Sequence, residues 1–182
     1  MPASCSATAA HGSSISSQPH RRPLHSPSNL LLPFMVRVYI DGGARGNPGP
    51  AGYGVRIEDA DGTLIEELYG GLGITTNNVA EYSGLLAALK WAVDHGHQQV
   101  QVRADSELLV KQMVGEYRVK HPGLQPLAAR ARLLIGQLDD VTFQHVRREQ
   151  NKEADRLSNL GMDQAEASLR EKPQGANRSR LF

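Results

Sequence analysis

Val36-Arg-Val-Tyr-Ile-Asp41-Gly-Gly-Ala-Arg-Gly-Asn47-Pro-Gly-Pro50 joins an alternating apolar pattern to a carboxylate and a glycine-rich segment. Val36, Val38 and Ile40 alternate with more polar residues, and this period of two predicts a strand that ends at Asp41, followed by a tight turn. A carboxylate beside exposed backbone N–H groups can hold a metal ion next to a phosphate. Since Asp-Gly-Gly is also a common turn sequence, this interpretation depends on acids elsewhere in the chain.

The composition is that of one globular domain. The chain has 182 residues, of which 40% are hydrophobic and 21% are charged, and these values are ordinary for a soluble protein with a single core. A net charge of +1 provides no strong overall field, so any nucleic-acid binding needs a local patch. The single cysteine excludes an intrachain disulfide, and no apolar run approaches the roughly 18–20 residues of a membrane span. We therefore expect a cytoplasmic monomer that does not contact a membrane.

The two ends of the chain differ from its middle. Residues 1–35 are rich in Ser, Pro, His and Ala and have no period, so we expect a disordered extension. This extension is either a targeting segment, which its lack of acids suggests, or the product of an upstream start codon; we favour the second, with Met35 as the true first residue. Residues 36–161 form the predicted domain. Residues 162–182 are expected to be a flexible tail, with weak nucleic-acid contact as the alternative.

Periodicity and turn signals predict an α/β fold for the domain. Strands are expected at 36–41, 51–58, 63–69, 99–104 and 141–146, and helices at 79–93, 106–114, 124–138 and 152–160. Residues 70–74 are predicted to be a loop, and Gly161 is predicted to end the last helix. An antiparallel meander followed by crossover helices implies a five-stranded mixed sheet, with antiparallel and parallel strands, flanked by helices.

Four acids fall at comparable places in this pattern. Asp41 and Asp105 follow strands, and Glu81 and Asp155 lie in the first turns of helices. Helix capping by Glu81 or Asp105 is the structural alternative. Glu81, however, lies one turn before Leu85 and faces the core, where an uncompensated acid is costly.

Divalent cations would explain why these acids converge. Four carboxylates in one hollow repel each other unless cations lie between them. Hard oxygen ligands suit Mg²⁺ or Mn²⁺ better than zinc, and two such ions about 3.5–4 Å apart serve phosphodiester cleavage.

Four segments resemble the type 1 ribonuclease H family: residues 39–54, Thr76-Asn-Asn-Val-Ala-Glu-Tyr82, Ala104-Asp-Ser106 and Asn151-Lys-Glu-Ala-Asp-Arg-Leu-Ser-Asn159. The resemblance runs from about Val36 to Gly161 in the family's order. It implies the ribonuclease H-like fold and endonucleolytic hydrolysis of the RNA strand of RNA–DNA hybrids. The products would carry 5′-phosphate and 3′-hydroxyl ends, and two Mg²⁺ ions, replaceable by Mn²⁺, would be the cofactors. The family's four metal-binding acids match Asp41, Glu81, Asp105 and Asp155.

The resemblance also implies which residues bind the substrate. A phosphate of the DNA strand would be held by Asn47, Thr76 and Asn77. Minor-groove contacts would come from the backbone of Gly42, Gly43 and Ala44 and from the Asn78 side chain. A helix that contains RNA shows its 2′-hydroxyls in a wide, shallow minor groove, which short polar groups can reach. The structural alternative for Asn77 and Asn78 is helix capping, which one of them can satisfy while the other binds.

Two departures from the family pattern place the chain near a particular branch. Many bacterial members carry a basic, tryptophan-rich handle after the second helix, but here residues 115–123 lead directly into the next helix. Arg118 and Lys120 either cover the DNA backbone there or are solvated. Many members also have a loop histidine before the last acid, whereas this loop holds Arg147 and Arg148. Some members of the branch that lacks both features also cut double-stranded RNA, which is therefore a second candidate substrate.

Arg148 occupies the position of the missing loop histidine, seven residues before Asp155. A guanidinium cannot shuttle protons near neutral pH, but it can form a two-pronged hydrogen bond with a phosphate. We hypothesise that Arg148 steadies the scissile or a neighbouring phosphate and helps the product leave. The alternative is that it caps the loop or pairs with Glu149. His145 is expected to be structural, because it lies within a strand. Two other functions are weighed against a ribonuclease: a non-catalytic hybrid-binding module and a different nuclease on the same fold.

Overall fold

The computed structural model describes residues 35–171, which belong to one compact unit. Its elements in chain order are β1 (Val36–Ala44), β2 (Gly49–Glu58), β3 (Leu64–Thr75), α1 (Asn77–Asp94), β4 (Gln99–Ala104), α2 (Glu107–Met113), α3 (Gln125–Ile135), β5 (Asp140–His145), the 3₁₀ turn η1 (Arg148–Gln150) and α4 (Lys152–Glu171). The predictions for residues 1–34 lie outside the described part. Within residues 35–171, no helix is both long and apolar enough to cross a membrane.

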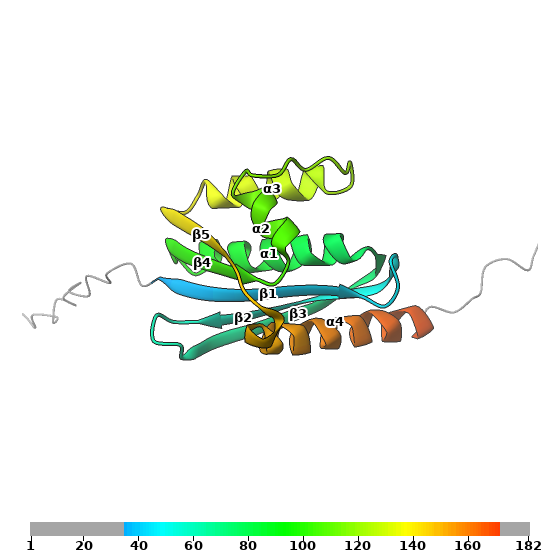
Figure 1. Ribbon diagram of the computed structural model, residues 1–182. Coiled ribbons are helices and arrows are strands. Elements are labelled where there is room, and N and C mark those ends of the chain that lie inside the picture. Colours follow the sequence, from blue (N-terminus) through cyan, green and yellow to red (C-terminus); the bar gives the residue numbers. More distant parts are fainter. Residues whose placement is uncertain (1–34, 172–182) are drawn as a thin grey trace, which may run out of the picture. The chain divides into compact units, whose positions relative to one another are not determined.

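The five strands form one mixed sheet in the order β3-β2-β1-β4-β5. The β1–β2 and β2–β3 pairs are antiparallel, whereas β1–β4 and β4–β5 are parallel. Helices α1, α2 and α3 lie on one side of the sheet and α4 lies on the other (Figure 1). This is the predicted fold class.

The main core lies between the sheet and α1. Val38 and Ile40 of β1 are fully buried, as the period of two predicts. They pack in one apolar cluster with Leu85 and Leu89 of α1. The first strand is therefore the central support of the molecule, with a strand on each side and helices on both faces.

Two strands run further than the sequence predicted. β1 does not end at Asp41, because Gly42 and Gly43 continue its pairing with β2 opposite Tyr53 and Gly52. The predicted loop at 70–74 is also wrong, because β3 continues through it to Thr75. These glycines were interpreted as turn signals, but they belong to extended, paired backbone.

The last helix is longer than predicted. Gly161 does not end α4; the helix continues to Glu171, so the expected tail is helical over residues 162–171, and residues 172–182 lie outside the described part. Gly161 is buried in the helix, where a Cβ would lie 2.7 Å from the carbonyl oxygen of Gly70 and 3.1 Å from the Cα of Gly52. The absence of a side chain at this position therefore allows α4 to pack closely on β2 and β3.

Candidate functional site

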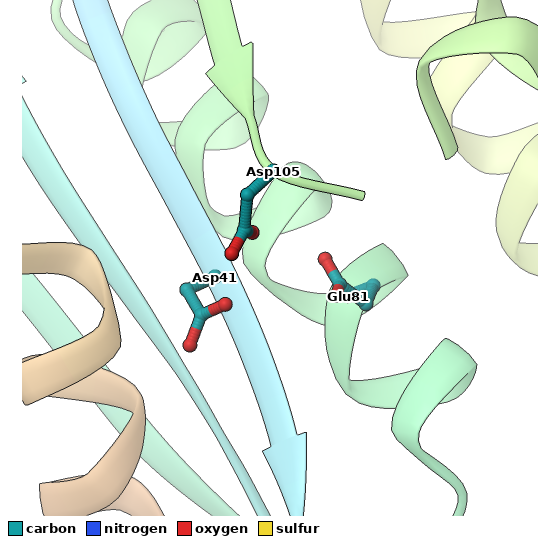
Figure 2. A group of neighbouring side chains, drawn as sticks. All are labelled: Asp41, Glu81 and Asp105. Atoms are coloured by element: carbon teal, nitrogen blue, oxygen red, sulfur yellow. The ribbon is translucent and has the colours of Figure 1, made fainter. Parts of the chain in front are cut away.

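Three of the predicted acids meet at one point beside the sheet. Asp41, Glu81 and Asp105 each offer a carboxylate oxygen, and these oxygens lie within 4.8 Å of one another. Figure 2 shows the three side chains gathered from β1, from the first turns of α1 and from the end of β4. Such a set of hard oxygen donors suits a divalent cation of the Mg²⁺ type.

The register of the sheet brings Asp41 and Asp105 together. Ile40 and Ala104 are the last paired residues of the parallel strands β1 and β4, so the two aspartates follow at the same level. Beyond this level β1 continues, while the chain leaves β4 and enters α2. The cap of α2 is Ser106, whose side-chain oxygen accepts from the Leu109 N–H. Asp105 is therefore not the helix cap that the structural alternative assumed.

A glycine brings Glu81 to the same place. A Cβ on Gly42 would lie 2.1 Å from the backbone nitrogen of Glu81, so only glycine lets α1 approach β1 this closely. Thr76 caps α1 by accepting from the Val79 N–H. Glu81 plays no part in this cap and is 6% exposed.

Burial and mutual repulsion shift the acidity of the site. Burial, with the nearby charges of Asp41 and Asp105, raises the pKa of Glu81 to about 9. Burial also raises the pKa of Asp41 to about 6; the hydrogen bond from Ser158 opposes this shift, and the charges of Asp105 and Asp155 add to it. The Oε2 atom of Glu81 is buried and has no hydrogen-bond partner among the described residues. A cation at this point would satisfy that atom and compensate the repulsion, so the residues present fit the metal that the fold family implies.

Asp155, the fourth predicted acid, is not part of this group. Its Oδ1 accepts from Arg148 Nη2 at 2.7 Å, and Asn159 Nδ2 lies 3.4 Å from its Oδ2. Arg148 is 78% exposed and its ion-pair partner is Asp155, not Glu149 as the sequence alternative assumed. The fourth carboxylate is thus occupied by a protein cation next to the other three.

Two buried polar residues that the sequence analysis left without a role support the acids. Asn151 Nδ2 donates to the Ile40 carbonyl at 2.9 Å and to Asp105 Oδ1 at 3.3 Å. Ser158 Oγ donates to Asp41 Oδ2 and lies 2.9 Å from the Asp155 carbonyl oxygen. Both side chains are 1% exposed. Their spacing was the available signal: Asn151 lies four residues before Asp155, directly ahead of α4, and Ser158 lies three residues after it, one turn along the helix.

The predicted substrate-binding residues line the neighbouring turn and helix start. Asn47 lies in the exposed turn between β1 and β2, and its Oδ1 accepts from the Asn77 N–H at 3.3 Å. Because Thr76 caps the helix, neither Asn77 nor Asn78 is needed for capping. Asn78 lines a small hollow together with Glu81.

The cations of the α2–α3 region and His145 are exposed. Arg118 and Arg132 line a hollow of about 350 Å³ between the α2–α3 connection and α3. Lys120 is exposed on the same connection. His145 lies at the end of β5, and its Nε2 is 3.2 Å from the Asp105 carbonyl oxygen.

Comparisons with known proteins agree with this architecture. A family model described as Reverse transcriptase-like matches residues 39–161. The chain is 46% identical over 134 residues to Bifunctional protein Rv2228c of Mycobacterium tuberculosis, covering 73% of this chain and 37% of that protein. The solved N-terminal RNase H domain of Rv2228c superposes with a TM-score of 0.72 at 45% identity, covering 75% of this chain and 99% of that one.

Two further relatives are similar over the same region. Ribonuclease HI of Halobacterium salinarum is 42% identical over 130 residues, which cover 71% of this chain and 65% of that protein. LC11-RNase H1, isolated from compost by a metagenomic approach, was solved in complex with an RNA/DNA hybrid. It superposes with a TM-score of 0.68 at 44% identity, covering 71% of this chain and 98% of that one. The chain thus spans about a third to two thirds of the length of these curated relatives.

Proposed function

Because the chain belongs to the type 1 ribonuclease H family, we propose that it hydrolyses the RNA strand of RNA–DNA hybrids endonucleolytically, leaving 5′-phosphate and 3′-hydroxyl ends. The observation that carries this proposal is the convergence of Asp41, Glu81 and Asp105, whose carboxylate oxygens lie within 4.8 Å of one another. Converging acids with an unsatisfied buried oxygen repel one another, which is costly in a purely structural site and favours a functional one.

Two Mg²⁺ ions, or Mn²⁺ in their place, would be held by Asp41, Glu81, Asp105 and Asp155. When bound, such ions polarise the phosphate and lower the pKa of a coordinated water. The protein's own contribution is to hold the acids in place: Asn151 fixes Asp105 to the β1 backbone, and Ser158 fixes one oxygen of Asp41.

The substrate would lie across the turn and helix start beside the acids. Asn47, Thr76 and Asn77 would hold a phosphate of the DNA strand, and Asn78 with the backbone of residues 42–44 would contact the minor groove. Arg118 and Lys120, neither of which has an ion-pair partner among residues 35–171, would add positive charge near the DNA backbone. Arg148 would steady a phosphate near the site, in exchange for its present contact with Asp155.

The second candidate substrate is double-stranded RNA. The α2–α3 connection is short and lacks a tryptophan-rich insertion, and the loop before α4 holds arginines, as in the branch that also contains double-strand-cutting members. We also propose that the protein is a monomer and acts in the cytoplasm. Light scattering at several protein concentrations would test the oligomeric state.

A gel comparison tests the proposed activity. The wild-type protein is incubated with an RNA–DNA hybrid, an RNA duplex and a DNA duplex of one sequence, with Mg²⁺ or with EDTA. We expect Mg²⁺-dependent cleavage of the hybrid's RNA strand. Cleavage of the DNA duplex would favour another nuclease on this fold, and binding of the hybrid without any cleavage would favour a non-catalytic binding module.

A further inference from the structure

Arg45, in the turn between β1 and β2, is bound by two acids from the far half of α4. Its Nη2 lies 2.6 Å from Asp163 Oδ1, and its Nη1 lies 2.8 Å from Glu166 Oε1. The acids are three residues apart, so they project from the same side of the helix. The guanidinium therefore contacts one carboxylate with each terminal nitrogen.

Within residues 35–171, few other polar contacts hold this turn to the neighbouring elements. Residues 45–48 are exposed, although the Arg45 N–H donates to the Pro50 carbonyl at 2.8 Å within the turn itself. On the side of α1, the Asn77 N–H donates a hydrogen bond of 3.3 Å to Asn47 Oδ1. The turn thus has one attachment toward α1, through Asn47, and one toward α4, through Arg45.

The far half of α4, which carries the partners of Arg45, is itself packed on the sheet. Met162 and Ala165 are 8% and 2% exposed, and Gln164 Oε1 accepts from the Gly71 N–H of β3 at 2.9 Å. Asp163 and Glu166 lie beyond residues 39–161, which the family model matches. Two of the three residues of this attachment therefore lie outside the part of the chain that the family model matches.

We propose that Arg45, Asp163 and Glu166 form a clamp that positions the 45–48 turn, and with it the Asn47 side chain, to receive a phosphate of the nucleic-acid backbone. This inference rests on the proposed function, because it assigns Arg45 to substrate binding through Asn47. The three residues are positioning residues: the clamp acts on binding and leaves the acids of the reaction centre untouched.

The competing explanation for a role of Arg45 in binding is a direct contact between its guanidinium and the substrate. A change of charge at its two acidic partners distinguishes this explanation from the clamp. The double variant Asp163→Lys/Glu166→Lys makes the protein more positive near the substrate, so simple attraction to a polyanion predicts tighter binding. The clamp predicts weaker binding, because the new lysines repel Arg45 and release the turn. The two explanations thus predict opposite signs for one measurement.

The experiment compares four full-length variants: Arg45→Glu, Asp163→Lys/Glu166→Lys, the combination of all three substitutions, and Lys90→Glu. The last is the control, because Lys90 and Asp94 also form an exposed ion pair, and it lies about 20 Å along α1 from its start. Steady-state kinetics on a short hybrid give KM and kcat. Amide hydrogen exchange at Gly46, Asn47 and Gly49 reports on the turn without any substrate.

We expect Arg45→Glu and Asp163→Lys/Glu166→Lys each to raise KM roughly threefold to tenfold over the wild type, with kcat changed by less than about twofold. Both should also speed amide exchange in the turn. The combined variant should recover both values, and Lys90→Glu should change neither. A lower or unchanged KM with unchanged exchange in Asp163→Lys/Glu166→Lys would overturn the clamp. If the wild-type protein cleaves no hybrid, the proposed function fails, and the exchange rates alone decide whether the clamp exists.

Discussion

Replacing Glu81 by Gln should stabilise the metal-free protein at neutral pH while removing its activity. The side chain is 6% exposed, and burial raises its pKa from an ordinary 4.5 to about 9. Between these two values the folded state binds more protons than the unfolded state, so the stability of the wild-type protein falls as pH rises. Gln has nearly the same shape and no charge, so it does not carry this penalty.

The magnitude follows from the pKa shift. Each pH unit above 4.5 costs about 1.4 kcal/mol of folding free energy until the folded-state pKa is reached. Glu81→Gln should therefore raise the free energy of unfolding by less than about 1 kcal/mol at pH 5 and by about 3 kcal/mol at pH 7. Added Mg²⁺ should reduce this difference in stability between Glu81→Gln and the wild type at pH 7, because a cation bound by the wild-type carboxylates stabilises the folded state.

Urea unfolding in EDTA at pH 5, 6, 7 and 8 measures this difference. Glu116→Gln is the matched control, because Glu116 is exposed and has no ion pair among residues 35–171; its effect should be near zero at every pH. A Glu81→Gln protein that is less stable than wild type at pH 7, or a difference that does not grow between pH 5 and pH 7, would refute the electrostatic account of the site.

Three further predictions concern other parts of the molecule. Arg148→Ala should lower turnover tenfold or more, which corresponds to about 1.4 kcal/mol of barrier, with little change in melting temperature because the side chain is 78% exposed. Arg147→Ala should act more weakly, and unchanged turnover of Arg148→Ala on a short hybrid would remove Arg148 from the site. Gly42→Ala should destabilise the fold by about 1–3 kcal/mol or more and abolish cleavage, because its Cβ would lie 2.1 Å from the backbone nitrogen of Glu81. Gly43→Ala is the milder control, because its Cβ would meet the flexible end of Met162 at 2.9 Å, and equal unfolding midpoints for the two variants would contradict this packing. A chain that begins at Met35 should keep full activity and its melting temperature, and a fall of many degrees would show that the preceding residues pack on the domain.

Sequence patterns predicted the five-stranded mixed sheet and the elements that carry the acids, because strand and helix periods are local signals. The strand at 99–104 was predicted with the bounds that the structure gives, since its alternating burial matches the period of two. Glu81 was expected to face the core from its spacing to Leu85, and it is buried. The parallel pairing of β1 and β4 places Asp41 and Asp105 at one level of the sheet, and α1 adds Glu81.

The errors share one physical cause, which is glycine used for close packing. Gly43, Gly71 and Gly161 resemble turn or cap residues in a sequence, because glycine is also the residue that tolerates unusual backbone angles. Here they lie where another element approaches: a Cβ on Gly71 would lie 2.7 Å from the Ala165 nitrogen of α4. That requirement arises from contacts between distant segments, so local patterns do not contain it. The same holds for the clamp on Arg45, whose partners lie more than a hundred residues away.

We propose that Asp41 takes part in metal-dependent hydrolysis at the acidic site, and single-turnover cleavage of a short RNA–DNA hybrid by Asp41→Asn is the decisive test. The variant should fold, with the circular dichroism spectrum of the wild type and equal or greater metal-free stability, because one repelling charge is removed from the site. We expect it to bind the hybrid and to release no RNA fragments in Mg²⁺, while the wild-type protein yields fragments with 5′-phosphate ends. A folded Asp41→Asn protein that cleaves the hybrid at the wild-type rate would show that Asp41 is not needed for hydrolysis.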